Sequence, residues 1–194
     1  MTCGCGPQKE GSTPSFRPLY RETSVSRDVP TKLDKLKMKI KIRKANLKDA
    51  IKIGEIYLEG TIDITKSQFP KRNKLNIIKE ANKWKKDRIR EFKKEINSKK
   101  NFWIVALICD KVVGFANAMI EKNKEGRLAM LYVKKEFRKK GIGRKLTQER
   151  IEWLKKKGIK KVYAGMFIKN KASRKNLEKI GFKPVSIKLE KQLK

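Results

Sequence analysis

The sequence contains no histidine, and this absence excludes several kinds of chemistry. Without an imidazole the chain cannot form a Ser-His-Asp or Cys-His pair, use a histidine base or bind zinc through histidine. Cysteine is scarce as well, with only Cys3, Cys5 and Cys109. An odd number is no disulfide framework, and Cys3 and Cys5 alone are too few for structural zinc, so we expect no metal site. Cys109 ends an apolar run and is expected to pack as a small hydrophobic residue.

Long apolar segments are also missing. The longest uncharged apolar run covers residues 102–109, whereas a membrane-spanning helix needs roughly 20 such residues. The first residues show no signal-peptide pattern. We therefore expect a cytoplasmic protein with no membrane partner.

Acidic residues are few, with 20 Asp and Glu against 53 Lys and Arg, which gives a formal net charge of +33. Residues 1–37 hold 7 basic and 4 acidic side chains, so residues 38–194 carry +30. This charge predicts an anionic partner, which could be nucleic acid, a phosphate-rich ligand or an acidic surface. A lysine-rich surface that serves solubility would explain most of the same charge.

Two parts of the chain differ in composition. Residues 1–37 are rich in Gly, Pro, Ser and Thr without apolar periodicity, and we expect a disordered or loosely attached N-terminal arm. Residues 38–194 have regular apolar patterning and enough length for one domain.

The patterning of residues 38–194 predicts the order β-α-α-β-β-β-α-β-α-β. Hairpins in the first half imply antiparallel neighbours, and a later strand-helix-strand unit implies a parallel pair. The expected fold class is therefore α+β, with a mixed, mostly antiparallel sheet flanked by helices in an α/β three-layer arrangement. The expected strands are 39–43, 102–109, 112–120, 128–133, 162–168 and 185–189.

The expected helices differ in how clearly their ends are marked. Asn46 or Asp49 would cap the first helix and Gly60 would end it, which leaves residues 61–71 as a loop. In the second helix we expect Trp84 to face inward with the other apolar residues. The other expected helices are 74–97, 143–156 and 171–180.

A basic, glycine-containing turn between a strand and a helix is the most informative segment. Glycines let backbone N–H groups approach an anion, and the start of a helix adds a positive dipole end, so the turn predicts a phosphate-binding cradle. It is not a P-loop, because the Gly-Lys-Ser/Thr ending is absent, and Leu146 replaces the third glycine of a dinucleotide motif. The turn consists of Arg138, Lys139, Lys140, Gly141, Ile142 and Gly143.

The pattern Arg138-x-x-Gly141-x-Gly143 resembles the acetyl-CoA-binding motif of the GNAT N-acetyltransferases. A second segment, from Asn170 to Gly181-Phe182, is similar to another signature of that family. There an asparagine follows the fifth strand and a Gly-Phe pair closes the next helix. The element order is similar too, and the resemblance covers about residues 38–192.

The resemblance implies the GNAT (acyl-CoA N-acyltransferase) fold, acetyl-CoA as cofactor and transfer of its acetyl group to a primary amine. The two parallel strands would splay apart to admit the thioester, and the backbone of the first would pair with the pantetheine arm. The asparagine could instead only cap its helix, and the serine could face solvent. The implied cofactor-binding residues are Leu131, Val133, Arg138, Lys139, Lys140, Gly141, Ile142, Gly143, Asn170, Ser173 and Arg174.

The catalytic acid is not where many family members have it. They place a tyrosine one position after the residue that corresponds to Asn176, and this chain has Leu177. We interpret Ser173 as the general acid that protonates the leaving sulfur, with Tyr163 or Tyr132 as alternatives.

The general base is equally open. We select Glu59, while Asp63, Glu121, Glu125 or a chain of waters remain alternatives. A protein α-amine titrates near ~8 and a lysine near ~10.4, so the α-amine is easier to deprotonate without a strong base. The expected acceptor is therefore a peptide N-terminus or a small amine, rather than a polyamine.

A different class of function competes with this one. Lys83-Trp84-Lys85-Lys86 and residues 155–157 are basic with an aromatic residue nearby. A GNAT-like domain with weak catalysis could bind RNA or the ribosome through them. A homodimer is left open by the sequence.

Overall fold

The computed structural model describes residues 39–187 and residue 191. The chain divides into a unit of residues Met1–Leu36 and a unit of residues Lys37–Lys194, and all described residues belong to the second. The arm expected over residues 1–37 therefore lies outside the described residues.

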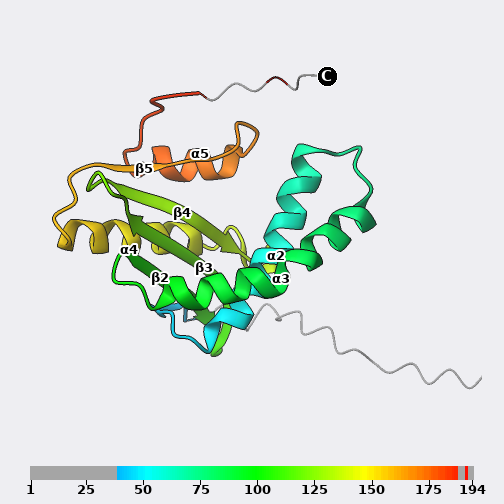
Figure 1. The fold of residues 1–194 in the computed structure, drawn as a ribbon. Coiled ribbons are helices and arrows are strands. Elements are labelled where there is room, and N and C mark those ends of the chain that lie inside the picture. Colours follow the sequence, from blue (N-terminus) through cyan, green and yellow to red (C-terminus); the bar gives the residue numbers. More distant parts are fainter. Residues whose placement is uncertain (1–38, 188–190, 192–194) are drawn as a thin grey trace, which may run out of the picture. The chain divides into compact units, whose positions relative to one another are not determined.

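The strands and helices of the described residues follow one another in nearly the expected order (Figure 1). Five strands form one sheet. The strands are β1 (Lys41–Lys44), β2 (Asn101–Ile108), β3 (Lys111–Ile120), β4 (Gly126–Val133) and β5 (Val162–Ala164). The helices are α2 (Asp49–Gln68), α3 (Lys74–Ile96), α4 (Ile142–Lys156) and α5 (Lys171–Glu178), with a 3-10 turn η1 (Lys135–Phe137).

The sheet has the order β1-β2-β3-β4-β5. The first four strands pair antiparallel, and β4 pairs with β5 in parallel. Alternate side chains of β2 face opposite sides, as a pleated strand requires. Trp103 and Val105 pack with α2 and α3, whereas Ile104 and Ala106 pack with α4. The expected mixed, three-layer fold class is confirmed.

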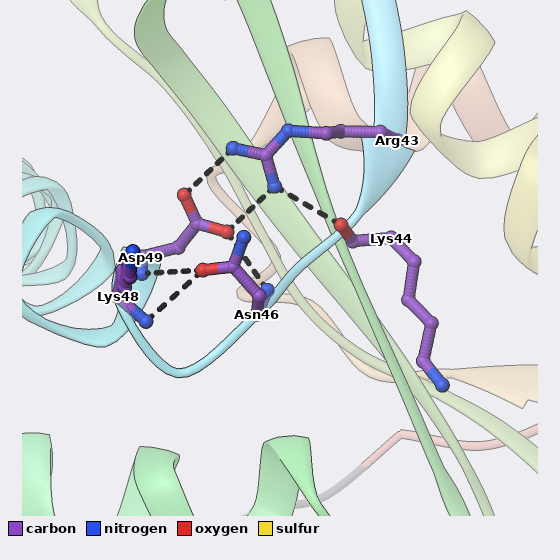
Figure 2. A network of polar contacts seen from close by, with 5 residues as sticks. All are labelled: Arg43, Lys44, Asn46, Lys48 and Asp49. Atoms are coloured by element: carbon purple, nitrogen blue, oxygen red, sulfur yellow. Dashed lines mark hydrogen bonds and ion pairs between the residues drawn. The ribbon is translucent and has the colours of Figure 1, made fainter.

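The start of α2 is held by a polar network that joins it to β1 (Figure 2). Asn46 Oδ1 accepts hydrogen bonds from the N–H groups of Lys48 and Asp49, while Asp49 Oδ2 accepts from the N–H of Asn46. This reciprocal pattern is that of a capping box. Arg43 adds two hydrogen bonds to the Asp49 carboxylate at 2.7 and 2.9 Å. Both residues expected to cap this helix therefore bond the turn that leads into it, whereas the N-cap position itself is Lys48, whose side chain makes no capping bond.

The predicted end of this helix at Gly60 is wrong, because α2 continues to Gln68. The helix replaces most of the loop expected over residues 61–71. Gly60 serves packing instead of termination: a Cβ atom there would lie 2.4 Å from the ring of Tyr132 on β4. A glycine inside a helix costs about 1 kcal/mol relative to alanine, and here it permits this close approach.

Two residues that were expected in the core, Trp84 and Cys109, are exposed. Trp84 on α3 is 61% exposed and lines a groove of about 230 Å³ between α2 and α3, together with Tyr57 and Arg88. The buried residues of α3 are Ile77, Ala81, Phe92 and Ile96, a stripe that leaves out Trp84.

Cys109 is exposed as well. It has a φ of 48° and is followed by Asp110 with a φ of 55°. The pair therefore forms the two-residue connection of the hairpin, where left-handed residues match the strand twist. The geometry of the turn overrides the apolar character of the cysteine.

The C-terminal strands are shorter than expected. β5 ends at Ala164 instead of residue 168, and Phe167 and Ile168 are exposed. Residues 185–187 of the expected last strand have no strand conformation, and Val185 is 89% exposed; residues 188 and 189 lie outside the described residues. Strand propensity alone does not form a strand where no neighbouring edge pairs with it.

Candidate functional site

The central feature of the site is the separation of β4 from β5. The two strands pair only from Gly126↔Val162 to Leu128↔Ala164. Beyond Leu128, β4 continues to Val133 without a β5 partner. The carboxyl end of β4 thus leaves one edge open, which is where open sheets with parallel strands bind ligands.

Backbone groups of Leu131 and Val133 point to this open edge. The N–H of Lys134 donates to Val113 O on β3, so every second residue of β4 is bonded towards β3. Tyr132 is in that set, and its neighbours Leu131 and Val133 face the other way. Both are among the residues that the sequence predicted to pair with the cofactor arm.

The turn after β4 presents a row of free backbone donors. No N–H from Lys139 to Arg144 donates a hydrogen bond to any residue of the described chain. Arg138 N–H is bonded to Lys135 O, so the free donors begin one residue later than expected. Gly141 has a φ of 77° and stands immediately before α4. Left-handed backbone at this point turns the free donors together at the start of the helix.

This cradle adjoins the open edge of β4. A Cβ atom on Gly143 would lie 3.7 Å from the Leu131 side chain, and one on Gly141 would meet nothing within 4 Å. Lys140 places its Nζ 5.1 Å from the ring centre of Phe137. Donors and cationic side chains suit an anion of the size of a pyrophosphate.

The start of α5 holds the second group of predicted residues. Asn170 caps the helix, because its Oδ1 accepts from the N–H of Ser173 at 3.1 Å. Ser173 is half-buried. Arg174 is exposed and pairs with Glu178 at 2.7 Å. The capping role that the sequence left open for Asn170 is thus present.

Arg138 turns its side chain away from the cradle. Its Nε donates to Val133 O at 2.9 Å, and its Nη2 donates to Asp63 Oδ2 at 2.8 Å and to the Tyr132 hydroxyl at 2.6 Å. The guanidinium lies over the Tyr132 ring, 5.0 Å from its centre. Arg138 therefore connects the cradle to α2, a contact that the sequence did not predict.

The electrostatics of this cluster follow from its bonds. Partial burial raises the pKa of Asp63, but hydrogen bonds from Arg138 and Tyr132 outweigh it and hold the pKa below its usual value. Burial, and then donation to Asp63, raise the pKa of Tyr132 well above its usual range. Asp63 is therefore a bound anion, and Tyr132 keeps its proton at neutral pH.

Glu59 lies one helical turn before Asp63 on α2 and has a freer carboxylate. Its side chain is 51% exposed, and its closest cation is Lys134 Nζ at 3.8 Å. The extension of α2 through Gly60 places both acids on one helix face, towards the end of β4. A carboxylate free of short hydrogen bonds is the better proton acceptor of the two.

The other candidate acids and the alternative tyrosine lie near the start of β4. Tyr163 donates to Glu121 at 3.2 Å, and Glu125 pairs with Lys161 at 2.7 Å. Tyr163 is level with Arg127 in the β4–β5 ladder. These groups are at the opposite end of β4 from the cradle.

Comparison with known families now adds to this geometry. The model of the acetyltransferase (GNAT) family matches residues 61–182, which is more than half of the chain. The chain belongs to the GNAT acetyltransferase family. None of the curated proteins compared with it is significantly similar over its sequence.

Solved structures of similar fold include known and predicted acetyltransferases. The PaiA N-acetyltransferase from Thermoplasma acidophilum, in complex with coenzyme A, is 25% identical, with a TM-score of 0.60 over 75% of this chain and 91% of that one. A predicted acetyltransferase with acetyl-CoA from Clostridium acetobutylicum is 18% identical, with a TM-score of 0.61 over 79% and 96%. The aminoglycoside N-acetyltransferase AAC(6')-Iy in complex with CoA is 16% identical, with a TM-score of 0.52 over 80% and 95%.

For this GNAT chain, two absences apply to the described residues. No helix among them is long and apolar enough to cross a membrane, and no three of their His, Cys, Asp or Glu side chains group as metal ligands.

A buried polar cluster beside the site was missed by sequence reasoning. It contains Asn117 on β3 and Thr147 and Arg150 on α4, all at most 3% exposed. In sequence, Arg150 is one basic residue among many on a helix, and no spacing separates it from the solvated lysines. Only the packing of α4 on the sheet places it inside.

Proposed function

We propose that this GNAT chain is an acetyl-CoA-dependent N-acetyltransferase that acetylates a primary amine. The observation that carries the proposal is the row of free N–H donors from Lys139 to Arg144 beside the open edge of β4. The donors would bind the pyrophosphate, and Leu131 and Val133 would pair with the pantetheine arm. The thioester would then lie where β4 and β5 separate.

The reaction needs positioning more than covalent help. The neutral amine nitrogen attacks the thioester carbon, and the carbonyl oxygen becomes an oxyanion. The amine proton passes to a base, for which we propose Glu59. Collapse of the intermediate breaks the C–S bond, and the sulfur leaves as a thiol with a proton, for which we propose Ser173 as donor. Ser173 then regains a proton from solvent and Glu59 releases its proton to solvent, so both groups are restored. The products are the acetylated amine and CoA.

A proline substitution tests the cradle without removing charge. Gly143→Pro deletes one free donor at a helix position where the N–H has no partner, so the helix tolerates it. We expect CoA affinity in calorimetry to fall at least about tenfold. Lys74→Pro places a proline at the first position of α3, away from the cradle, and should bind CoA as the wild type does even though it also removes one exposed cation. Equal affinity of both variants would contradict this placement of the pyrophosphate.

The catalytic roles are tested by turnover at saturating acetyl-CoA. Ser173→Ala and Glu59→Gln should each lower kcat by about 10²-fold with CoA affinity unchanged. Glu152→Gln, an exposed acid on α4, is the matched control. Full turnover of Ser173→Ala would remove the serine from the mechanism.

The acceptor is identified with a panel of amines. We expect peptide α-amines or small uncharged amines to be the best substrates, because the positive chain repels polycations and an α-amine loses its proton more easily. Spermidine or a lysine-rich peptide as the best acceptor would contradict this choice.

One observation favours a second function. Trp84 is 61% exposed and lines the groove between α2 and α3 together with Lys85 and Arg88, so aromatic and basic groups share that surface. Exposed aromatic rings among cations stack on bases of single-stranded RNA. Trp84→Ala should then weaken RNA binding, measured by gel shift, while CoA binding stays unchanged.

A further inference from the structure

The guanidinium of Arg150 is buried without a carboxylate. The residue is 3% exposed, and within residues 39–187 no acidic side chain lies in ion-pair range of it. Burial lowers its pKa to about 9. Burying a cation with no anion is costly. The groups that bond Arg150 should therefore indicate why an arginine is buried at this position.

The neighbours of Arg150 are backbone carbonyls at a break between β3 and β4. The pairs run to Ala116↔Leu131 and then resume at Ala118↔Leu128, so β4 contains one extra residue, a β-bulge. A regular ladder would bond Asn117 with Met130 at this level. In this structure, hydrogen bonds from side chains take the place of that backbone pair.

Two side chains replace the missing pair. Asn117 Oδ1 accepts from the N–H of Met130 at 2.8 Å. Arg150 Nη1 donates to Asn117 O at 3.0 Å and to Met130 O at 3.2 Å. Three backbone groups of this pair, the N–H of Met130 and the carbonyls of Asn117 and Met130, are thus bonded to side chains.

The bulge decides which way β4 faces. Leu128 and Val133 are five positions apart and would face opposite sides of a regular strand. Both are buried against residues of α4, Leu128 with Leu154 and Val133 with Leu146. The extra residue makes this possible, so the orientation of the open edge at Leu131 depends on the bulge.

The same cluster reaches both sequence motifs. Thr147 Oγ1 donates to Gly143 O in the cradle at 2.8 Å and accepts from Arg150 Nη2 at 3.2 Å. Asn176 on α5 donates to the same oxygen at 3.5 Å. Arg150 therefore bonds the bulge directly and is linked through Thr147 to the cradle and to α5.

We propose that Arg150 is a positioning residue for acetyl transfer, whose guanidinium holds the β4 bulge open and so fixes the edge of Leu131 relative to the cradle. This inference rests on the proposed function. Arg150 acts through the carbonyls of Asn117 and Met130 and touches neither the thioester nor the amine. Its loss should therefore reduce turnover more than cofactor binding.

The first test compares three arginine substitutions. Arg150→Met should lower kcat at least about tenfold while the dissociation constant for CoA changes by less than about threefold. Arg150→Lys keeps a donor at the carbonyls and should recover part of the kcat, and it carries the test if the methionine variant does not fold. Arg90→Met makes the same change at an exposed position of α3 and should retain full turnover. A kcat of Arg150→Met within about twofold of the wild type overturns the proposal.

A second variant tests whether Arg150 acts through its hydrogen bonds to the bulge or through its positive charge. Asn117→Asp keeps the oxygen that accepts from Met130 and places the other oxygen where Nδ2 is buried without a partner among the described residues. It supplies the missing anion without removing a bond. Bracing predicts a kcat within about threefold of the wild type, and a fall of more than about tenfold would show that the positive charge matters instead, which overturns the proposal.

Amide hydrogen exchange tests the brace without any turnover. In Arg150→Lys, and in Arg150→Met if it folds, the N–H group of Met130 should exchange at least about tenfold faster, while that of Val105 in β2 is unchanged. Unchanged exchange at Met130 overturns the proposal. If the wild type acetylates no amine, the proposed function fails, and the exchange result still decides whether Arg150 braces the bulge.

Discussion

Individual side chains connect the turn after β4 to α2. Arg138 belongs to the turn that would bind the pyrophosphate, yet its guanidinium bonds Asp63 on α2 and the hydroxyl of Tyr132 on β4. Asp63 is therefore occupied as a structural anion. Glu59, one turn earlier, has no hydrogen bond as short among the described residues and remains the stronger candidate for the base.

Tyr132→Phe distinguishes Ser173 from Tyr132 as the candidate acid. The substitution keeps the ring against Gly60 and under Arg138 and removes only the hydroxyl, which bonds Asp63 at 2.9 Å. If Ser173 is the acid, kcat should stay within about threefold, while loss of the hydrogen bond lowers the free energy of unfolding by about 1 kcal/mol. Steady-state kinetics and urea unfolding measure both. A fall in kcat above about tenfold would assign the acid to Tyr132.

Asp49 predicts a pH dependence of stability. Burial raises its pKa, but the hydrogen bond from Arg43 and that from the N–H of Asn46 lower it further, so the folded pKa lies below the unfolded one. The carboxylate then stabilises the fold above its unfolded pKa of about 3.9, and this contribution is lost as the pH falls through the folded pKa.

Asp49→Asn should therefore cost about 2 kcal/mol near neutral pH, and the difference from the wild type should shrink in acid. Urea unfolding at several pH values measures it. Asp110→Asn, the same substitution at an exposed hairpin turn, is the matched control. A difference that does not change with pH would contradict the ionic origin.

At the scale of elements, the length of α2 has the largest consequence for the site. A helix ending at Gly60 would leave Asp63 in a loop. The continuous helix places Glu59 and Asp63 on one face and brings that face to Tyr132 through the glycine. The packing of α2 against β4 thus places Glu59, the proposed base, near the carboxyl end of β4.

Gly60→Ala tests this contact. Alanine favours a helix by about 1 kcal/mol, but its Cβ would lie 2.4 Å from the Tyr132 ring, so overpacking should give a net loss of about 1–3 kcal/mol. In a Tyr132→Ala background the same change should become neutral or stabilising. Unfolding free energies of the four proteins of this double-mutant cycle give the coupling, and additive effects would contradict the contact.

At the scale of the whole molecule, the net charge of +33 acts as a field over the site. The cofactor is an anion, so the field should aid its binding and salt should screen it. We expect the dissociation constant for CoA to rise several-fold between about 0.05 and about 0.5 M NaCl. Calorimetry at constant pH measures this, and an affinity independent of salt would show that only the cradle's direct contacts matter.

The sequence by itself determined the fold class, the alternation of elements and the family, because local periodicity and the Arg138-x-x-Gly141-x-Gly143 turn depend on residues close in the chain. It also located the cradle, where the backbone supplies the donors. The end of α2, the outward face of Trp84, the shortened β5 and the burial of Arg150 depend on which surfaces meet. Propensity is a weak prior there, and packing between segments far apart in sequence decides. The bulge of β4 was set in the same way, by a side chain from a helix twenty residues further along the chain.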